Sequence, residues 1–470
     1  MPRKALREIL REFCGSFTSL PTFDNFTTLL CGWILCTGRH TISRVIQAAG
    51  AENEKSYSTY YRFFSQAVWE SDALGRVLVS MLLRLQQGPR LTAIVDDTLS
   101  RRRGPHVWGA GFHHDPVSST YGGEDGPTVR FACGHCWVVL CLWVPLPWNA
   151  DRGLAIPVFW RLYRQKKRCP AETYRKKTEL ANELIAQLLA VVPVAYNFLL
   201  VGDGDYACST VVQKLPPRVT FIGPAVKDAA LFAPPPRRTG NVGRPRKMGA
   251  RLPSPEQLAA DKSVRWKKAS VRIYGREVEL LVKTQTCLWW TVAGQRLVKV
   301  VLTRDPKGRI EDRTYFTTDP GQEVHEILGV FSRRWSQEVM HRDVKQHLGL
   351  EDPQNGWWRN PRGQRRNQRV PGPQPHEHRG EKAARRTAPL AFVVYAIVAI
   401  WYLEHGSPSA DVRRARARAP WYLQKVAPSV GDMLEAARRD LWAERISKIA
   451  TLRALPEKAA ALVSGWLAAV

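Results

Sequence analysis

The chain has 470 residues, 44% of them hydrophobic, which is enough for two or three domains and excludes a mainly disordered protein. Seventy Lys and Arg residues outnumber 42 Asp and Glu residues, and the net charge of +28 far exceeds the about 2–8 charges that solubility requires. A positive field of this size attracts polyanions, so nucleic acid is the favoured partner, with an acidic membrane surface as the alternative.

The nine cysteines are too few and too scattered for a disulfide framework. Cys31, Cys36 and Cys141 lie in apolar runs, where free thiols behave as small hydrophobic groups. The N-terminus lacks the apolar stretch of a signal peptide, and the longest apolar run, Ala388 to Leu403, is shorter than the roughly 20 residues that span a bilayer. We therefore expect a cytoplasmic protein with a buried helix in that run and no membrane segment.

The first 88 residues are predicted to be helical. Apolar residues recur at helical spacing from Phe26 to Ala49 and from Tyr57 to Leu85. We interpret this part as an N-terminal helical DNA-binding domain.

Residues 89–232 are rich in short β-prone runs and contain one amphipathic helix, Tyr174 to Val192. The expected strands are Leu91–Asp97, Trp137–Val144, Ile156–Tyr163, Phe198–Val201 and Val219–Ile222. Strands followed by a strand–helix–strand unit predict a mixed α/β sheet.

Residues 233–320 begin with a Pro-, Gly- and Arg-rich linker and continue with short β-like runs between Val264 and Tyr315, which predict a small inserted β subdomain. Residues 321–405 are expected to hold a long helix, Glu323 to Leu348, and a basic loop, Arg359 to Arg386, that lies along phosphate or in solvent. Residues 406–470 are expected to close the chain as a helical region.

Two of the expected strands end in acidic residues: Asp96 and Asp97 end one strand, and Asp203 and Asp205 follow another. Ligand sites of α/β sheets gather outside the carboxyl ends of strands, so these acids converge if the two strands are neighbours. Mg²⁺ takes carboxylate and phosphate oxygens, and two such ions can clamp the attacking and leaving oxygens of a phosphodiester. Neighbouring residues of a strand point to opposite faces, so the sequence leaves open which Asp of each pair faces a metal.

The long helix carries a carboxylate between cations on one face. At about 100° per residue, Phe331, Arg334, Glu338 and Lys345 fall within an arc of roughly 60°. On this face Glu338 can hold a metal while Arg334 and Lys345 bind the phosphates on either side. Ordinary helical ion pairs are the alternative explanation of the same spacing.

The same segment resembles the Tyr-x2-Arg-x3-Glu-x6-Lys signature of DDE transposases from bacterial insertion sequences, with Phe331 where that group has Tyr. The two upstream Asp residues match the group's order, since Asp97 precedes Thr98 and Asp203 follows a buried strand. The resemblance covers the chain from Ala93 to Leu403.

The resemblance implies an RNase H-like catalytic core of the α/β class, with the β subdomain inserted between the second Asp and the Glu. It implies Asp97, Asp203 and Glu338 as catalytic residues and ligands of Mg²⁺, for which Mn²⁺ can substitute. It also implies double-stranded DNA with terminal inverted repeats as substrate, cutting and strand transfer as the reactions, and a homodimer in the synaptic complex. The expected location is then the bacterial cytoplasm, in association with the nucleoid.

Several further side chains are expected to contact DNA: Phe331, Arg334, His341, Arg342, Lys345, Trp289 and Trp290. For the two tryptophans, packing in the core of the β subdomain is the favoured alternative. A metal role for Cys133 and Cys136 is not favoured, because the second ligand pair of a zinc site is missing. The competing functions are a nuclease that only hydrolyses DNA and a catalytically lapsed DNA-binding derivative of a transposase.

Overall fold

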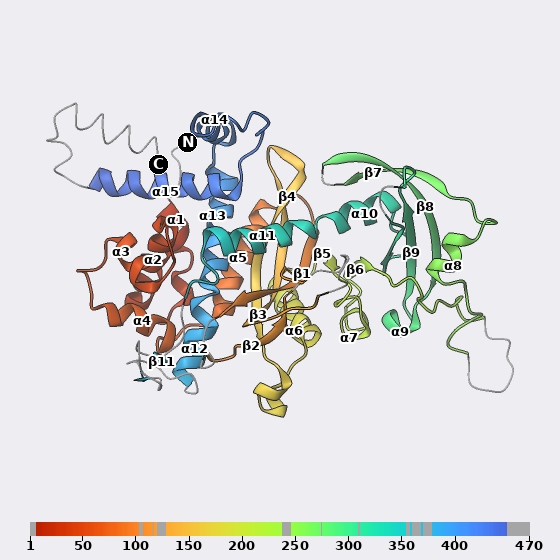
Figure 1. Ribbon diagram of the computed structural model, residues 1–470, viewed down its shortest axis with the longest axis horizontal. Helices are drawn as coiled ribbons and strands as arrows, with labels where there is room; N and C mark the ends of the chain where they lie inside the picture. The colour runs from red at the N-terminus through yellow and green to blue at the C-terminus, as the bar shows by residue number, and fades with distance from the viewer. Residues whose placement is uncertain are drawn as a thin grey trace.

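The computed structural model describes residues 6–448 except 103–106, 116, 120–127, 237–245, 274, 309–310, 354–357, 360–367 and 370–377. Figure 1 shows helices α1–α5 at one end of the long axis, and β7–β9 with α8 and α9 at the other end. Between them lie the strands of a sheet, with α10 and α11 running across it (Figure 1).

The region before the first strand is helical, as the apolar spacing predicted. Its helices are α1 (Leu6–Arg11), a short 3₁₀ turn (Cys14–Ser16), α2 (Leu20–Leu35), α3 (Ile42–Ala49), α4 (Tyr57–Ser65) and α5 (Ser71–Leu85). Each of the two long helices expected there is therefore two helices. The second break occurs where Trp69 turns into the core and stacks on Phe63, with ring centroids 4.9 Å apart.

One mixed sheet organises the rest of the fold. Its strands are β1 (Arg90–Arg101), β2 (Gly111–His114), β3 (Phe131–Leu146), β4 (Asn149–Tyr163), β5 (Asn197–Gly202), β6 (Val219–Pro224), β7 (Lys267–Ile273), β8 (Arg276–Leu288), β9 (Leu297–Arg304) and β10 (Arg313–Thr317). The strand order is β2-β3-β1-β5-β6-β10-β9-β8-β7, and β4 pairs with β3. Because β5 is parallel to β1 and β6 whereas the other pairs are antiparallel, the predicted mixed α/β class is confirmed.

The strands expected as a separate inserted subdomain extend this same sheet. β10 pairs with β6 through Tyr315↔Pro224, Phe316↔Gly223 and Thr317↔Ile222. Backbone hydrogen bonding therefore continues from β1 to β7, and the insertion is not a separate sheet. The division of the chain into five regions remains a prediction.

The remaining helices cover the sheet and close the chain. They are α6 (Lys177–Val191), α7 (Ser209–Val212), α8 (Pro255–Ala260), α9 (Trp290–Ala293), α10 (Val324–Ser332), α11 (Trp335–His347), α12 (His378–Thr387), α13 (Leu390–His405), α14 (Pro408–Arg418) and α15 (Val430–Lys448), with short 3₁₀ turns at Lys166–Arg168 and Ala171–Thr173. A separate two-stranded ladder joins β11 (Trp358–Arg359) to β12 (Gln368–Arg369).

Helix α13 is the central core helix, since every residue from Leu390 to Tyr402 is buried. It packs against β4, α2, α5 and α15. Residues 378–405 are long and apolar enough to cross a membrane by length and composition, yet 89% of their apolar window is buried inside this fold. The buried helix expected from the sequence is therefore confirmed.

Gly75 lies where α5 touches β4, and a Cβ at this position would lie 2.3 Å from the Val158 carbonyl oxygen. Gly329 of α10 is a matched control, because its Cβ would meet its nearest atom at 3.5 Å, an ordinary contact. Replacing Gly by Ala inside a helix normally stabilises it by about 0.5–1 kcal/mol. We expect Gly329→Ala to follow this rule and Gly75→Ala to destabilise the fold by about 1–3 kcal/mol, because overpacking forces the backbone to move. Urea unfolding of both variants measures the two free energies, and a stabilised Gly75→Ala would contradict the α5–β4 packing.

Candidate active site

Strands β1 and β5 bring the two acidic pairs together. The strands are parallel, and their last paired residues are Val95 and Gly202. Asp96 and Asp203 follow at the next positions, and Asp203 is close enough for its charge to raise the pKa of Asp96. The two strands are neighbours, as the predicted convergence required. The expected end of the first strand at Asp97 is wrong, because β1 continues to Arg101 through its pairing with β3.

The face of β1 that carries Asp96 is the face approached by the α10–α11 turn. Arg333 of this turn donates to the Thr92 hydroxyl at 2.6 Å, and the Arg334 guanidinium lies 3.4 Å from Asp96 Oδ2. Thr92 and Asp96 are four residues apart on one strand, so both side chains point to the same side. Asp96 is thus the member of its pair that faces the helix carrying Glu338.

Asp97 points to the opposite face, toward α6. Its Oδ2 accepts a hydrogen bond from Lys177 Nζ at 2.7 Å and lies 3.3 Å from the Cys136 thiol. Its Oδ1 accepts from the Tyr206 hydroxyl at 3.1 Å. Both carboxylate oxygens of Asp97 are therefore bound by side chains of the protein, in contrast to the metal-ligand role that the resemblance implies for this residue.

Glu338 lies one turn into α11, at a place where the expected long helix is divided. Hydrogen bonds of the 3₁₀ type, Arg334 N to Phe331 O at 3.1 Å and Gln337 N to Arg334 O at 2.9 Å, separate α10 from α11. Arg334 Nη2 lies 2.5 Å from Glu338 Oε1. A single guanidinium therefore links the carboxylate of Asp96 to that of Glu338.

Helix α11 is held on the sheet at both of its ends, by β1 at its C-terminal end and by β3 at its N-terminal end. Beyond its C-terminus, the Leu350 carbonyl oxygen accepts from the Ser100 hydroxyl at 3.1 Å and from Arg102 at 2.9 Å. Near its N-terminus, Gln337 donates to the Val139 carbonyl at 3.0 Å. These contacts determine where Glu338 lies relative to the strand ends.

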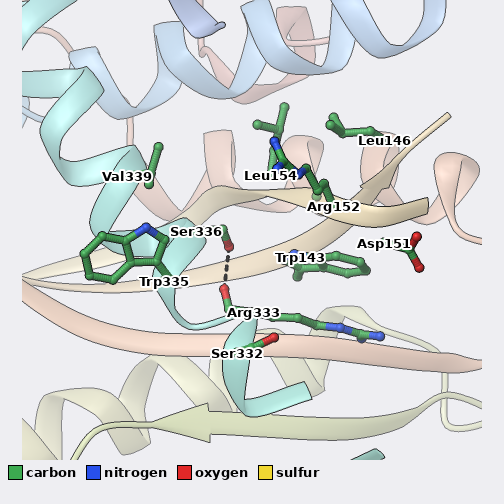
Figure 2. A pocket seen from close by; sticks show the side chains of 11 residues that line it. Trp143, Leu146, Asp151, Arg152, Leu154, Ser332, Arg333, Trp335, Ser336 and Val339 are labelled. Carbon is green, nitrogen blue, oxygen red and sulfur yellow. Dashed lines mark hydrogen bonds between the residues drawn. The ribbon is translucent and has the colours of Figure 1, made fainter. Parts of the chain in front are cut away.

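A pocket of about 620 Å³ lies beside the start of α11, between the α10–α11 turn and the β3–β4 hairpin. In this pocket the Arg333 guanidinium stacks on the Trp143 ring at 4.1 Å, and Figure 2 shows the Arg333 side chain extending beneath that ring. The Ser336 hydroxyl donates to the Arg333 carbonyl at 2.6 Å (Figure 2). This stacking, together with the bond to Thr92, anchors the turn that orients Arg334.

Burial and like charges raise the pKa of Asp96 to about 8, the charges being those of Asp203 and Asp97, while Arg334 opposes the shift. Burial also raises the pKa of Asp203, as do the charges of Asp205 and Asp97. A buried and a half-buried carboxyl group whose pKa values are both raised favour a cation beside them.

The donor set fits a magnesium ion. Mg²⁺ is usually held by one or two carboxylates together with waters and substrate phosphates, which Asp96 and Asp203 satisfy. Within the described part of the chain, no group of three His, Cys, Asp or Glu side chains is close enough to enclose an ion. Glu338 is engaged by Arg334, so it would complete the site only after Arg334 has moved toward another anion.

The other residues expected along this helix lie in different environments. His341 is 7% exposed, and burial lowers its pKa to about 3, so it is neutral and turned into the core. The structure therefore does not support a DNA contact by His341. Arg342 is exposed and pairs with Asp343 at 2.8 Å, Lys345 is half-buried, and the Phe331 ring packs on Tyr315 with centroids 4.8 Å apart.

The two tryptophans expected near DNA also lie in different environments. Trp289 is 4% exposed and packs edge-on against Phe316, with centroids 5.0 Å apart, so it belongs to the core. Trp290 is half-buried with Lys247 5.8 Å from its ring. The basic stretch Arg359 to Arg386 lies largely outside the described residues.

Sequence reasoning missed Lys177 and Tyr206, which contact Asp97. Lys177 begins α6, and Tyr206 lies three residues after Asp203. The available signal was the pattern Gly202-Asp203-Gly204, since a Cβ on Gly202 would lie 3.0 Å from the Tyr206 Cβ. A glycine at that point lets the chain fold back under the strand end.

Comparison with known families yields one match. A family model described as DDE superfamily endonuclease matches residues 12–289, which is more than half of the 470 residues. The matched segment contains both acidic pairs and ends before α11 begins, so Glu338 lies outside it. The search of curated proteins finds no match.

The raised pKa of Asp96 predicts a pH-dependent effect of Asp96→Asn on stability. In the unfolded chain this carboxyl ionises near a pH of about 3.9, whereas in the folded chain it stays protonated until the pH approaches about 8. The folded state therefore binds the proton more tightly, and the carboxyl destabilises the fold increasingly as pH rises through this window. Because one pKa unit corresponds to about 1.4 kcal/mol, we expect the variant to gain up to about 4 kcal/mol over wild type between pH 5 and pH 8.

Urea unfolding without divalent metal measures this gain. Asp24→Asn is the control, because the Asp24 side chain is 61% exposed. A difference between Asp96→Asn and wild type that stays constant with pH would mean that Asp96 is ionised and compensated in the folded protein.

Proposed function

Because the chain belongs to the DDE superfamily of endonucleases, we propose that it is the transposase of a bacterial insertion sequence. In this proposal it binds the terminal inverted repeats of the element, cuts the DNA there and joins the freed ends to target DNA. Two copies act together, one on each end of the element. The superfamily typically uses divalent metal ions and acts on DNA.

The arrangement of two carboxylates around Arg334, with Asp203 beside them, supports this proposal. Asp96 and Asp203 follow the last paired residues of the parallel strands β1 and β5, and Arg334 links Asp96 to Glu338 on α11. We propose Asp96, Asp203 and Glu338 as the catalytic carboxylates, with Asp96 in place of the adjacent Asp97. Asp97 is bound by Lys177 and Tyr206 on the other face of β1.

Each side chain then has a defined task at the scissile phosphate. Asp96 and Asp203 would hold metal ions, which would supply charge stabilisation for the attacking and leaving oxygens. Arg334 transfers its hydrogen bonds from the carboxylates to a DNA phosphate, which its planar fork suits. That transfer frees Glu338 for the metal site. Lys345, two turns along the same helix, contributes charge toward the adjacent phosphates.

The chemistry consists of two displacements at phosphorus. In the first, a water oxygen bonds to the phosphorus at the element end, the bond to the 3′ oxygen breaks, and that oxygen takes a proton to give a free 3′ hydroxyl. In the second, this hydroxyl loses its proton, attacks a phosphodiester of target DNA and displaces the target's 3′ oxygen. The second step exchanges one phosphodiester for another and needs no oxidant or energy source.

Glu338→Gln tests the proposal, with Glu326→Gln as a matched control. Both glutamates lie on the α10–α11 segment and pair with an arginine, Glu338 with Arg334 at 2.5 Å and Glu326 with Arg90 at 2.6 Å. We expect Glu338→Gln to lower cleavage more than about 100-fold, since even outer-shell partners of a metal site are worth about 10–100-fold. Glu326→Gln should cut at the wild-type rate.

The assay uses the full chain, Mg²⁺ or Mn²⁺, and DNA that contains both ends of the element, and it records cutting and joining separately. Cutting and joining that require Glu338 agree with the transposase. Cutting without joining would identify a hydrolytic nuclease instead. DNA binding without any chemistry in wild type would identify a lapsed enzyme, and equal activity in the two variants would remove Glu338 from the site.

A further inference from the structure

A second cleft of about 620 Å³ adjoins the candidate active site, beside Phe331 and Arg334. Exposed arginines from three different strands line it: Arg152 of β4, Arg276 of β8 and Arg313 of β10. We call it the arginine cleft. These residues lie far apart in the sequence and meet only because β8 and β10 extend the sheet.

The arginine cleft carries a net positive charge, because four arginines and two acidic residues, Asp305 and Glu311, line it. Among the described residues, Arg152, Arg276 and Arg313 form no ion pair. Asp305 Oδ1 accepts from the Lys307 backbone N–H at 3.0 Å, and Glu311 lies 3.9 Å from Lys227. Three guanidinium groups around one cleft suit an oxyanion ligand, because each presents a fork of N–H donors.

We propose that the arginine cleft binds the phosphates of the DNA strand that runs from the scissile bond toward β8 and β10. This proposal rests on the proposed function, because Arg334 lines the cleft and also links Asp96 to Glu338. The aromatic rings of Tyr315 and Phe331 form part of its wall, and Trp335, which is 52% exposed, stands at its rim. A strand that reaches Arg334 at the carboxylates therefore lies beside the cleft that the three arginines line.

Replacing Arg152, Arg276 and Arg313 together by Gln tests this path. The control replaces Lys214, Arg413 and Arg416 by Gln; these are also exposed and without an ion pair among the described residues. Each triple variant removes the same charge. In a plot of the logarithm of DNA affinity against the logarithm of salt concentration, the downward slope is about 0.9 for each phosphate contact. The slope of the cleft variant should therefore be smaller than that of wild type by about 2–3, and the slope of the control should be unchanged.

Glu338-dependent cleavage at saturating DNA distinguishes failure of the arginine-cleft proposal from failure of the proposed function. A cleft variant that cuts normally at saturation but binds with a reduced salt slope supports the arginine cleft. Equal slopes for the cleft variant and the control would overturn it while leaving the proposed function intact. A wild-type protein without metal-dependent cleavage would overturn both.

A different observation concerns the separation of Asp96 and Asp203. The last paired residues of β1 and β5 are Val95 and Gly202, so Asp96 and Asp203 lie beyond the ladder that joins these two strands, although Asp96 still pairs with Val139 of β3. Tyr206, which is fully buried, contacts both Asp203 and Asp97. Its backbone N–H donates to Asp203 Oδ1 at 3.3 Å, and its hydroxyl donates to Asp97 Oδ1 at 3.1 Å.

Asp97 is in turn hydrogen-bonded to Asp96. Its backbone N–H donates to Asp96 Oδ1 at 2.8 Å, and Lys177 holds its other carboxylate oxygen at 2.7 Å. We infer that Tyr206 and Lys177 are positioning residues that act through Asp97 to hold Asp96 at the separation from Asp203 that a divalent ion needs. This inference also rests on the proposed function, in which Asp96 and Asp203 bind the metal.

Tyr206→Phe removes only the hydroxyl and has a close control in Tyr402→Phe. Tyr402 is also buried, and its hydroxyl donates to the Asp411 carboxylate at 2.7 Å, far from the strand ends. Titration of the metal-free full-length protein with Mn²⁺, followed by the spectroscopic signal of free Mn²⁺, measures the dissociation constant directly. We expect Tyr206→Phe to raise it about 10–100-fold, as loss of an outer-shell partner does, and Tyr402→Phe to leave it unchanged.

Lys177→Gln provides a second variant, with Lys425→Gln as its control, because Lys425 pairs with Asp432 at 2.6 Å in an equivalent way. Weaker Mn²⁺ binding in Tyr206→Phe and Lys177→Gln, but not in the two controls, supports the inference. Wild-type Mn²⁺ affinity in both site variants, with binding lost in Asp96→Asn, would overturn the positioning role alone. Mn²⁺ binding that survives Asp96→Asn would overturn the metal assignment and this inference with it.

Discussion

The repulsion between two carboxyl groups, the buried Asp96 and the half-buried Asp203, is the constraint on which the centre of this molecule depends. Parallel pairing of β1 with β5 brings both groups to the end of the ladder between these strands, and burial deprives them of much of the water that would stabilise their charges. The surrounding residues respond to this cost in two ways. Arg334 supplies a cation to Asp96 from the side of α11, and the turn after β5 donates two backbone N–H groups to Asp203.

The two faces of β1 have different roles because successive side chains alternate. The face with Thr92 and Asp96 receives the α10–α11 turn and with it the only side chain that contacts both Asp96 and Glu338 among the described residues. The face with Asp97 receives α6 and the Tyr206 hydroxyl. A rigid central strand therefore presents one carboxylate for chemistry and uses its neighbour to hold the first in place.

Only part of the large positive charge lies on the surface. Several arginines donate hydrogen bonds to backbone carbonyls inside the fold, such as Arg386 to Ala67 at 2.8 Å and Arg438 to Ile34 at 2.7 Å. These side chains join the N-terminal helices to the C-terminal ones and are not available to DNA. The exposed arginines of the arginine cleft lie beside Arg334, so their positive charge is next to the carboxylates that Arg334 contacts.

Local patterns in the sequence were sufficient to predict much of the secondary structure of this protein. The strands around the acidic pairs, the helical N-terminus, the buried helix α13 and the shared face of Arg334 and Glu338 all follow from spacing within a few turns of chain. Tertiary structure determined which side chains face the site and which distant strands pair, because residue spacing along the sequence does not predict these features. Asp96 faces α11 and Asp97 does not, because a shift of one residue on a strand inverts the direction of its side chain. β10 joins β6 and makes one continuous sheet, because pairing between distant segments depends on the whole fold. His341, one turn from Glu338, is turned into the core because α11 packs against β1, β4 and α13 on that side.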